Sequence, residues 1–384
     1  MEHPVPSQEA YGLVQAKKPV FAILTVEDDI QLFRGNRSNF ADIIRAGSQH
    51  GFTVYVVTTR QLKLSRTRIM GYSYSEDSET WYKGQFPLPD IVYNRVPMRE
   101  DEMLPDVRKK IAACLKHPTI RLFNPAFFNK WSLFEWLNLS KSTRPYIPAT
   151  RKLVSRIGLR RMLQQHPFLY LKPISGKAGV GIMSVRVHPD KPHPYRLKMQ
   201  QKRKSRTYRC STLSSLWLQI KKQSAGEAYI AQQGIELAAV SDRQFDLRAL
   251  LQKNQRGQWD ITGIGARVAG TTSITTHVPR GGSIEDPEKM LVGSFGTEQA
   301  RKLMVKAKNA ALLIARQIER SSGQVLGEMS MDLGVDRTGG VWFFEANSKP
   351  MKFDEPHIRQ KSLERIFQYG QYLLKQKRKK AGGG

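Results

Sequence analysis

Cysteine and acidic residues are scarce in this sequence, and both shortages exclude classes of protein. The 384 residues include only two cysteines, Cys114 and Cys210, which lie far apart in the chain. Two isolated cysteines supply neither a disulfide framework nor a thiolate metal site, and they agree with a reducing compartment. Asp and Glu number 33 against 62 Lys and Arg, which gives a formal net charge of +29. Such a charge attracts polyanions, acidic proteins or anionic surfaces without specifying which.

Long apolar runs are also missing. No stretch approaches the ~20 residues that a membrane span needs, and residues 1–18 lack the apolar core of a signal peptide. We therefore expect a cytoplasmic protein without a membrane span. A chain of 384 residues that is 40% hydrophobic is long enough for a full core and for two or three domains.

Several familiar catalytic patterns are absent too. The first apolar run, residues 19–25, is not followed by the glycine-rich turn of a dinucleotide-binding fold. The Walker spacing of glycines, lysine and serine or threonine does not occur, and no Ser/His/Asp or Cys/His arrangement is recognisable.

The first part of the chain has the pattern of a small α/β domain. The apolar run at 19–25 predicts a buried parallel strand, helical spacing follows at 39–49, and the residues at 53–58 predict the next strand. A further strand at 91–94 and a helix at 101–116 complete the pattern. We predict that residues 1–118 form this domain.

Residues 327–350 are the most informative stretch. Alternation through 329–335, turn residues at 336–340 and a second apolar run at 341–345 predict a β-hairpin. Asp332 on the first strand, with Glu345 and Asn347 on the second, would place three hard oxygen ligands on one edge, as Mg²⁺ beside nucleotide phosphates requires. An ordinary hairpin with solvated acids has the same local pattern, so the rest of the chain must decide.

A glycine-rich loop lies between two β-rich runs at 168–187. It contains Ser175, Gly176, Gly179 and Gly181. Because strands flank it on both sides, it predicts a hairpin tip rather than the opening of a helix. Such a tip can fold over a triphosphate and donate backbone N–H groups, with Lys172 reaching the phosphates from the strand beneath. The glycines alone are weak evidence; the acidic hairpin strengthens them.

Three further side chains are candidates for the same site. Lys130 begins an amphipathic helix at 129–137, although a solvated surface lysine is the simpler reading of that helix in isolation. Arg248 and Arg267 project from predicted strands and suit a fork-like grip on phosphate or acyl phosphate. An Asp-Arg surface ladder is comparably consistent with either arginine alone.

The most basic part of the middle region is 188–210. We interpret it chiefly as a solvated insertion, with a polyanion-binding patch as the alternative. A helix at 358–374 is expected to close a second domain, residues 119–374, and residues 375–384 to form a basic, glycine-ended tail.

These motifs, taken together, resemble the ATP-grasp superfamily, and more closely its YheC/YheD branch, whose members are described as endospore coat-associated proteins. The resemblance covers almost the whole chain and is strongest over 120–352. The motifs that carry it are Phe-Asn-Lys at 128–130, the Tyr-Leu-Lys-Pro strand and glycine loop at 170–182, Gln-Gln-Gly-Ile at 232–235, Phe-Asp-Leu-Arg at 245–248, Gly-Ala-Arg-Val at 265–268 and Glu-Ala-Asn-Ser-Lys-Pro at 345–350.

The resemblance implies an ATP-grasp fold of mixed α/β and α+β class, in which two α+β lobes enclose ATP and a small α/β domain precedes them. It implies roles for the following residues: Lys130 and Lys172 on the ATP phosphates, Gln233, Gly234 and Ile235 at the adenine hinge, Glu236 as a weaker ribose candidate, Asp332, Glu345 and Asn347 as metal ligands, and Arg248 and Arg267 near the transferred phosphate. His277 stands where we expect Asn in the family, which puts its contribution in doubt.

The activity implied is an ATP- and Mg²⁺-dependent carboxylate–amine ligase linked to spore or envelope formation, with ATP and an unidentified acid and amine as partners. A phosphotransferase of the same fold is a variant of this hypothesis. The alternatives are a spore-associated protein that binds nucleotide without turnover, and a polyanion-binding module driven by the +29 charge.

Overall fold

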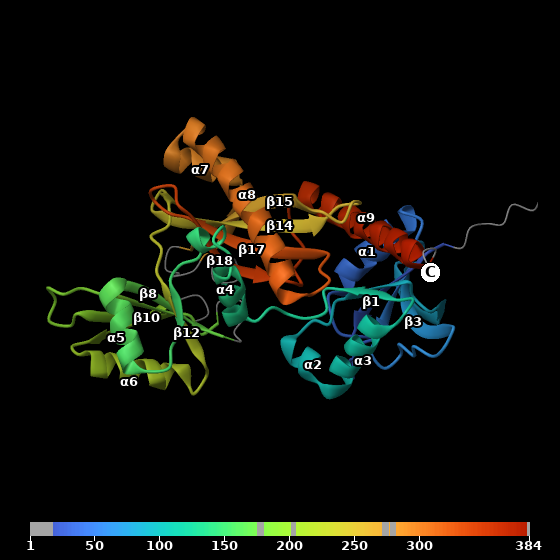
Figure 1. Ribbon diagram of the computed structural model, residues 1–384, viewed down its shortest axis with the longest axis horizontal. Coiled ribbons are helices and arrows are strands. Elements are labelled where there is room, and N and C mark those ends of the chain that lie inside the picture. The colour runs from blue at the N-terminus through green and yellow to red at the C-terminus, as the bar shows by residue number, and fades with distance from the viewer. Residues whose placement is uncertain (1–17, 175–179, 201–204, 271–275, 277–281, 382–384) are drawn as a thin grey trace, which may run out of the picture.

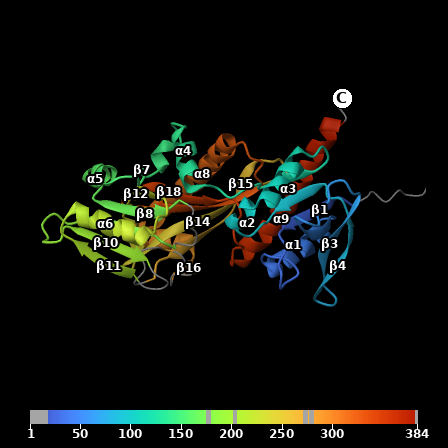
Figure 2. The same ribbon diagram turned by 90° about the horizontal axis from the view of Figure 1, so that it is seen from below.

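The computed structural model describes residues 18–174, 180–200, 205–270, 276 and 282–381, with the side chains of residues 377–381 excepted. These residues form three sheets that follow one another along an elongated molecule (Figures 1 and 2). The sheet formed by the first part of the chain lies at one end, the sheet that contains β8 and β12 lies at the other, and the sheet built around β14 and β17 lies between them. The described helices include none that combines the length and apolarity needed to cross a membrane.

The first sheet has the order β4-β3-β2-β1-β5-β6 and confirms the predicted β-α-β start, because β1, β2, β5 and β6 are parallel. The elements of this region are β1 Val20–Thr25, α1 Arg37–Gln49, β2 Thr53–Thr58, β3 Arg68–Ser75, β4 Thr80–Pro87, β5 Ile91–Asn94, α2 Arg99–Met103, α3 Pro105–Lys116 and β6 Arg121–Phe123. The sequence reading missed the β3–β4 hairpin.

Two details of this region differ from the sequence interpretation. The single helix expected at 101–116 is divided into α2 and α3, because Leu104 is extended and Pro105 opens a new helix, where its missing N–H costs nothing. The first sheet also continues past residue 118, since β6 pairs with β5 at Arg121 to Phe123.

The second sheet is antiparallel, with the order β11-β10-β9-β8-β12-β7. Helices α5 and α6 cover one of its faces through a cluster that includes Leu159, Leu169, Val185 and Leu216. The elements that lead into and form this lobe are α4 Lys130–Asn138, η1 Arg144–Tyr146, β7 Thr150–Lys152, α5 Arg156–Gln165, β8 Phe168–Pro173, β9 Met183–Val187, β10 Tyr195–Gln200, β11 Ser205–Cys210, α6 Leu213–Ser224 and β12 Tyr229–Gln233. The basic region is therefore not a simple solvated insertion, because β10 and β11 extend the sheet.

The third sheet has the order β16-β15-β14-β17-β18, with β13 paired to β14. The long helix α8 covers one face through Leu303, Ala307, Ile314 and Ile318. The elements of this region are β13 Ala239–Val240, β14 Arg243–Lys253, β15 Trp259–Val268, β16 Ser283–Glu285, α7 Pro287–Phe295, α8 Thr297–Ser322, β17 Glu328–Val335, β18 Val341–Asn347 and α9 Pro356–Ala381.

The predicted acidic hairpin is confirmed as β17 and β18. Asp336 organises its turn: one carboxylate oxygen accepts the N–H groups of Thr338 and Gly340, both at 2.8 Å, and the other accepts the Trp342 indole N–H at 2.7 Å. Gly339 has a positive φ of 83°, a conformation that glycine adopts without a steric penalty. The turn thus sets the register in which the two strands pair.

Helix α9 joins the first and third sheets. Its Phe367 and Tyr369 enter the core of the first sheet, whereas Ile358 packs beside Phe353 and Leu250 of the third. The helix ends at Ala381, so the tail expected from residue 375 is wrong as a separate segment: up to Ala381 it continues α9.

Candidate functional site

A cleft lies between the second and third sheets, where sequence-distant motifs meet. Its lining comes from both sheets and from the segment that connects them, and comprises Tyr170, Lys172, Ile182, Gln232, Gln233, Ile235, Leu237, Gln244, Asp246, Ala269, Thr276 and Phe344. Uncharged side chains make up most of this lining, while Lys172 and Asp246 contribute charge. Clefts of this composition at lobe junctions are the usual sites for small molecules.

Lys172 projects into the cleft from β8. Its ammonium donates to the Gln232 side-chain oxygen at 2.6 Å and lies 5.4 Å from the centre of the Phe344 ring. The pKa of Lys172 is lowered to about 8, chiefly by burial and then by the Lys130 ammonium, whereas three nearby carboxylates, led by Glu345, act in the opposite direction. The lysine is therefore desolvated and incompletely neutralised, as a group awaiting an anion would be.

Lys130 reaches the same place from the third-sheet side. It is the first residue of α4, which Asn129 caps by accepting the N–H groups of Trp131 and Ser132. The Lys130 ammonium lies 2.9 Å from a Glu345 oxygen, and the side chains are only 14% and 23% exposed. The solvated-surface reading of Lys130 is thus excluded.

The three proposed metal ligands lie on one face of the β17–β18 hairpin. Asp332 and Glu345 are directly opposite each other in the strand register, and Asn347 is opposite Ser330, two positions along. Two carboxylates and an amide are the hard oxygen donors that Mg²⁺ takes, and phosphate oxygens commonly complete such a set. Among the described residues no group of three or more His, Cys, Asp or Glu is arranged to hold a metal.

The two candidate arginines differ in their surroundings. Arg267 is 5% exposed, binds both Asp246 oxygens at 2.8 and 2.7 Å and lies 2.8 Å from Asp332. Burial alone would lower the pKa of Arg267, but Asp246 and Asp332 together raise it above its usual value.

Arg248 is 25% exposed, lies 3.9 Å from Asp332 and donates to Ser330 at a long 3.4 Å. Arg267 is committed to protein carboxylates, whereas Arg248 retains donors for another group.

The predicted hinge follows β12. The N–H groups of Gln233 and Gly234 donate to the Ala149 and Phe168 carbonyls, both at 2.8 Å, and Gln233 and Ile235 line the cleft. A Cβ at Gly234 would lie 2.2 Å from the Phe168 ring, so only glycine lets the chain pass that close. Glu236 forms an ion pair with Arg186, whose guanidinium stacks 3.6 Å from the Phe168 ring centre.

Of the glycine loop, Gly181 is described. It has a φ of 73°, and its carbonyl accepts the Tyr229 hydroxyl at 2.9 Å. Ser175, Gly176, Gly179 and His277 lie outside the described residues.

Several residues that the sequence analysis did not propose belong to the same region. The Thr276 hydroxyl donates a hydrogen bond of 2.5 Å to the Asp246 carboxylate beside Arg267. The Gln232 side-chain oxygen accepts the hydrogen bond from the Lys172 ammonium. Only the spacing of Asp246 from Arg248 hinted at a shared face. Glu355, which precedes α9, has one buried carboxylate oxygen without a hydrogen-bond partner among the described residues. A Cβ at Gly265, opposite Arg248, would lie 2.3 Å from the other Glu355 oxygen.

The end of the hairpin is tied to the first sheet by buried charges. Lys349, two residues after Asn347, is 8% exposed, bonds the Val96 carbonyl at 3.1 Å and pairs with Glu102. Burial lowers the pKa of Lys349 to about 8 although Glu102 opposes the shift. Arg95 pairs with Glu328 at 3.2 Å. These contacts hold the end of the β17–β18 hairpin in a defined position relative to the first sheet.

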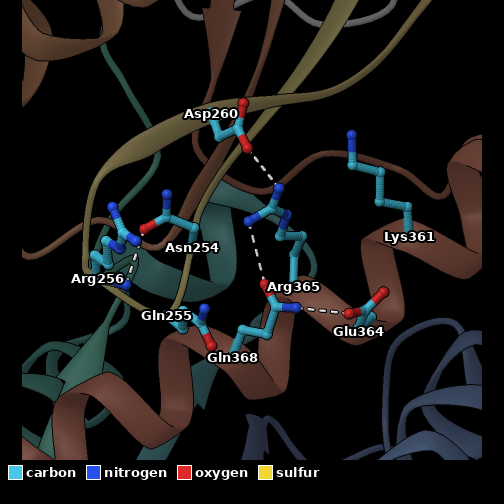
Figure 3. Close-up of a pocket in the computed structure, with 8 residues that line it drawn as sticks. All are labelled: Asn254, Gln255, Arg256, Asp260, Lys361, Glu364, Arg365 and Gln368. Atoms are coloured by element: carbon cyan, nitrogen blue, oxygen red, sulfur yellow. Dashed lines mark hydrogen bonds and ion pairs between the residues drawn. The ribbon is translucent and has the colours of Figure 1, made fainter.

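A separate groove between the β14–β15 turn and α9 is lined by polar residues (Figure 3). Its charges are largely used within the protein. Arg365 bridges Asp260 and Gln368, and Lys361 donates to the Ile261 carbonyl at 3.0 Å. We regard this groove as the seam where α9 docks on the third sheet.

The overall fold has counterparts among solved structures. D-alanyl-alanine synthetase A from Vibrio cholerae aligns with 94% of this chain and 98% of its own, with a TM-score of 0.55 and 12% identity. The ATP-grasp ligase PsnB, complexed with a minimal precursor, aligns with 91% of this chain and 99% of its own, with a TM-score of 0.52 and 13% identity. The fold is that of the ATP-grasp superfamily, as the sequence predicts.

Sequence comparison defines the family within that fold. The profile described as "YheC/D like ATP-grasp" matches residues 119–373, and the chain belongs to this family. It is 28% identical over 369 residues to the endospore coat-associated protein YheD of Bacillus subtilis, covering 92% of this chain and 79% of YheD. The predicted family is thereby confirmed.

Proposed function

We propose that this protein is an ATP- and Mg²⁺-dependent carboxylate–amine ligase. The observation that carries the proposal is the convergence of Lys130 and Lys172, from separate elements, on the Asp332 and Glu345 carboxylates beside the cleft that Lys172 lines. A site with desolvated cations beside paired carboxylates suits a triphosphate whose charge is shared between lysines and a divalent cation. The fold shared with a protein named a synthetase and with one named an ATP-grasp ligase supports the same reaction class.

In this proposal the nucleotide lies along the cleft from hinge to hairpin. The purine occupies the side lined by Gln233 and Ile235, next to Gly234, and the phosphates meet Lys172 and Lys130. Ser175, Gly176, Gly179 and Gly181 are kept as phosphate contacts from the sequence pattern alone. Glu236 is a weaker ribose contact, because it already pairs with Arg186.

Asp332, Glu345 and Asn347 are the residues that would hold Mg²⁺. When bound, the cation would neutralise phosphate charge beside these oxygens. Lys130, which pairs with Glu345, would then exchange that carboxylate for a phosphate oxygen. Asp332 and Glu345 lie directly opposite each other on paired strands, where like charges need compensation, and the cation would supply it to Glu345 once Lys130 turns to a phosphate.

The reaction proceeds in two balanced steps. A carboxylate oxygen of the first substrate bonds to the γ-phosphorus of ATP while the β–γ bridging bond breaks, which gives an acyl phosphate and ADP. The nitrogen of the second substrate then bonds to the acyl carbon, phosphate leaves, and the nitrogen loses a proton. Arg248, which retains hydrogen-bond donors, stabilises the charge that develops on oxygen. Arg267 pairs with Asp246 and Asp332 and so fixes the positions of these two carboxylates.

Glu355 is our candidate for the amine side of the site. One Glu355 carboxylate oxygen is buried without a hydrogen-bond partner among the described residues, and the other lies beside Gly265, which is opposite Arg248 in the strand register. A carboxylate in that place can accept a hydrogen bond from an ammonium or amine and take up the proton released.

The test is release of ADP and phosphate from ATP and Mg²⁺ over panels of acids and amines. The native protein should show acid-dependent ADP release, and Glu345→Gln should nearly abolish it. Undiminished turnover in Glu345→Gln would refute the assignment of this site.

A second candidate function is nucleotide binding without turnover in a spore-associated protein. The names of the relatives, endospore coat-associated proteins YheD and YheC, favour it. Clear ATP binding, with no ADP released across the panels, would support this candidate over the ligase.

A further inference from the structure

The inner face of the second sheet carries an unusual row of like charges. Arg186 of β9, Arg196 of β10 and Arg209 of β11 are directly opposite one another in the strand register. Their neighbours along the strands, Val185 and Leu197, point the other way, into the core under α5 and α6. All three arginines therefore lie on the face away from the helices, the face from which Lys172 enters the cleft.

Such a row is costly unless something compensates it. Like charges directly opposite on paired strands destabilise a sheet. Arg186 is compensated by Glu236 and by stacking on Phe168. Arg196 and Arg209 are exposed, and no carboxylate among the described residues forms an ion pair with either. The exposed guanidinium groups of Arg196 and Arg209, next to the paired Arg186, therefore form a surface that can bind an anion.

The row has a direction. It begins at Arg186, which is opposite Phe168 near the hinge, and ends at Arg209 on β11, the edge strand of the sheet. Figure 2 shows β10 and β11 at the outer end of this lobe. Neighbouring strands are ~4.8 Å apart, so the three positions span about 10 Å, the length of about three residues of extended peptide. A chain lying on the row would reach the mouth of the nucleotide cleft.

We propose that this arginine row, Arg186, Arg196 and Arg209, is a docking track for an extended acidic peptide. The planar guanidinium forks match carboxylates and phosphates alike. The choice of a carboxylate chain rests on the proposed function, because the adjoining cleft would then consume carboxylates. A chain with several acidic side chains engages the row at successive strands and presents one carboxylate to the cleft.

The alternative explanation is that charged side chains merely protect β11 from pairing with other chains. The two explanations differ in binding. A protective charge needs no partner, whereas a docking track has an affinity that depends on these arginines and not on equal charge elsewhere. The overall charge of +29 makes that distinction essential.

The experiment measures binding of a short fluorescent oligo-glutamate by anisotropy, without nucleotide, at low and at physiological ionic strength. The test variant is Arg196→Ser with Arg209→Ser. The matched control is Arg160→Ser with Arg161→Ser, which removes the same charge from exposed positions of α5, on the opposite side of the same lobe. Because ATP is absent, failure of the ligase proposal leaves this measurement unaffected.

The row variant should bind oligo-glutamate about tenfold more weakly, the effect of losing two exposed ion pairs, and the control should change less than about twofold. The row variant should also melt no lower than the native protein, since it loses a like-charge contact. Equal weakening in both variants would show attraction by net charge alone and overturn the proposal, as would no weakening in the row variant. Stronger, row-dependent binding of inorganic polyphosphate would overturn the assignment to an acidic peptide.

Discussion

Asp332 and Glu345 are directly opposite each other on β17 and β18, and each is neutralised by a cation from outside the hairpin. Arg267 reaches Asp332 from the same sheet at 2.8 Å, and Lys130 reaches Glu345 from α4 at 2.9 Å. The two carboxylates therefore have different partners: Asp332 pairs with a buried arginine that also binds Asp246, and Glu345 pairs with a lysine that, in our proposal, turns to a phosphate. That asymmetry leads to the predictions below.

Glu345→Gln should remove the Mg²⁺-dependent part of nucleotide binding. The substitution keeps the shape of the side chain but removes a ligand charge and the partner of Lys130. Turnover should fall by more than the roughly ten- to hundredfold that the loss of an outer partner of a metal ligand costs. Thermal shift with ATP, with and without Mg²⁺, measures the effect on binding.

Glu298→Gln is the matched control for this variant. Glu298 also pairs with a lysine, Lys302 at 2.7 Å, but its side chain is 85% exposed on α8. Its loss should leave the Mg²⁺ response unchanged. An equal Mg²⁺ response in Glu345→Gln and Glu298→Gln would contradict the metal-ligand role of Glu345.

ATP binding should take up a proton near Lys172. The pKa of Lys172 is about 8 without nucleotide, chiefly because the side chain is buried, and a phosphate beside it would raise that pKa. The bound state then holds more protons than the free state, so ATP affinity should fall as the pH rises through 8. Calorimetry at about pH 8.5 in buffers of different ionisation enthalpy measures the uptake, and Lys172→Met should abolish it. Equal uptake in Lys172→Met would assign the proton to another group.

Local patterns in the sequence predicted many of the helices and strands, but they did not predict which of these elements contact one another. The alternation around Met329 and Met331 and the turn at Asp336 predict the hairpin, because a strand pair with a short turn is set by neighbours in the chain. The β10–β11 hairpin was missed since its charges, among them Arg196 and Lys198, obscure the alternation of Leu197 and Met199.

Contacts across long stretches of chain have no local signal. Lys130 and Glu345 are 215 positions apart, and only the resemblance to a family placed them together before the fold was known. The sequence gives no sign that Glu355 is a candidate site residue. Its candidacy depends on one buried oxygen without a hydrogen-bond partner among the described residues and on the space that Gly265 leaves beside the other oxygen. Geometry, rather than residue type, distinguishes such a carboxylate from the solvated acids around it.

Arg267 and Arg248 should separate stability from catalysis. Arg267→Met leaves Asp246 and Asp332 buried without their shared cation, so the free energy of unfolding should fall by about 3–5 kcal/mol. Arg248→Met removes a partly exposed, loosely paired group, so the same quantity should fall by less than about 1 kcal/mol while turnover is lost. Urea unfolding beside ADP release checks both. Equal stability losses in the two variants would contradict the distinct roles proposed.

Gly234→Ala should weaken ATP binding through the hinge. An added Cβ would lie 2.2 Å from Phe168, whose ring holds Arg186 at 3.6 Å, so either the ring or the hinge must move. Overpacking of this kind costs about 1–3 kcal/mol, and displacement of the chain beside Gln233 and Ile235 should lower ATP affinity in calorimetry. Gly84→Ala, on β4 of the first sheet, is the control, because the added Cβ there lies an ordinary 3.4 Å from Phe86. If Gly234→Ala destabilises the protein but binds ATP as tightly as Gly84→Ala, the purine does not lie against this hinge.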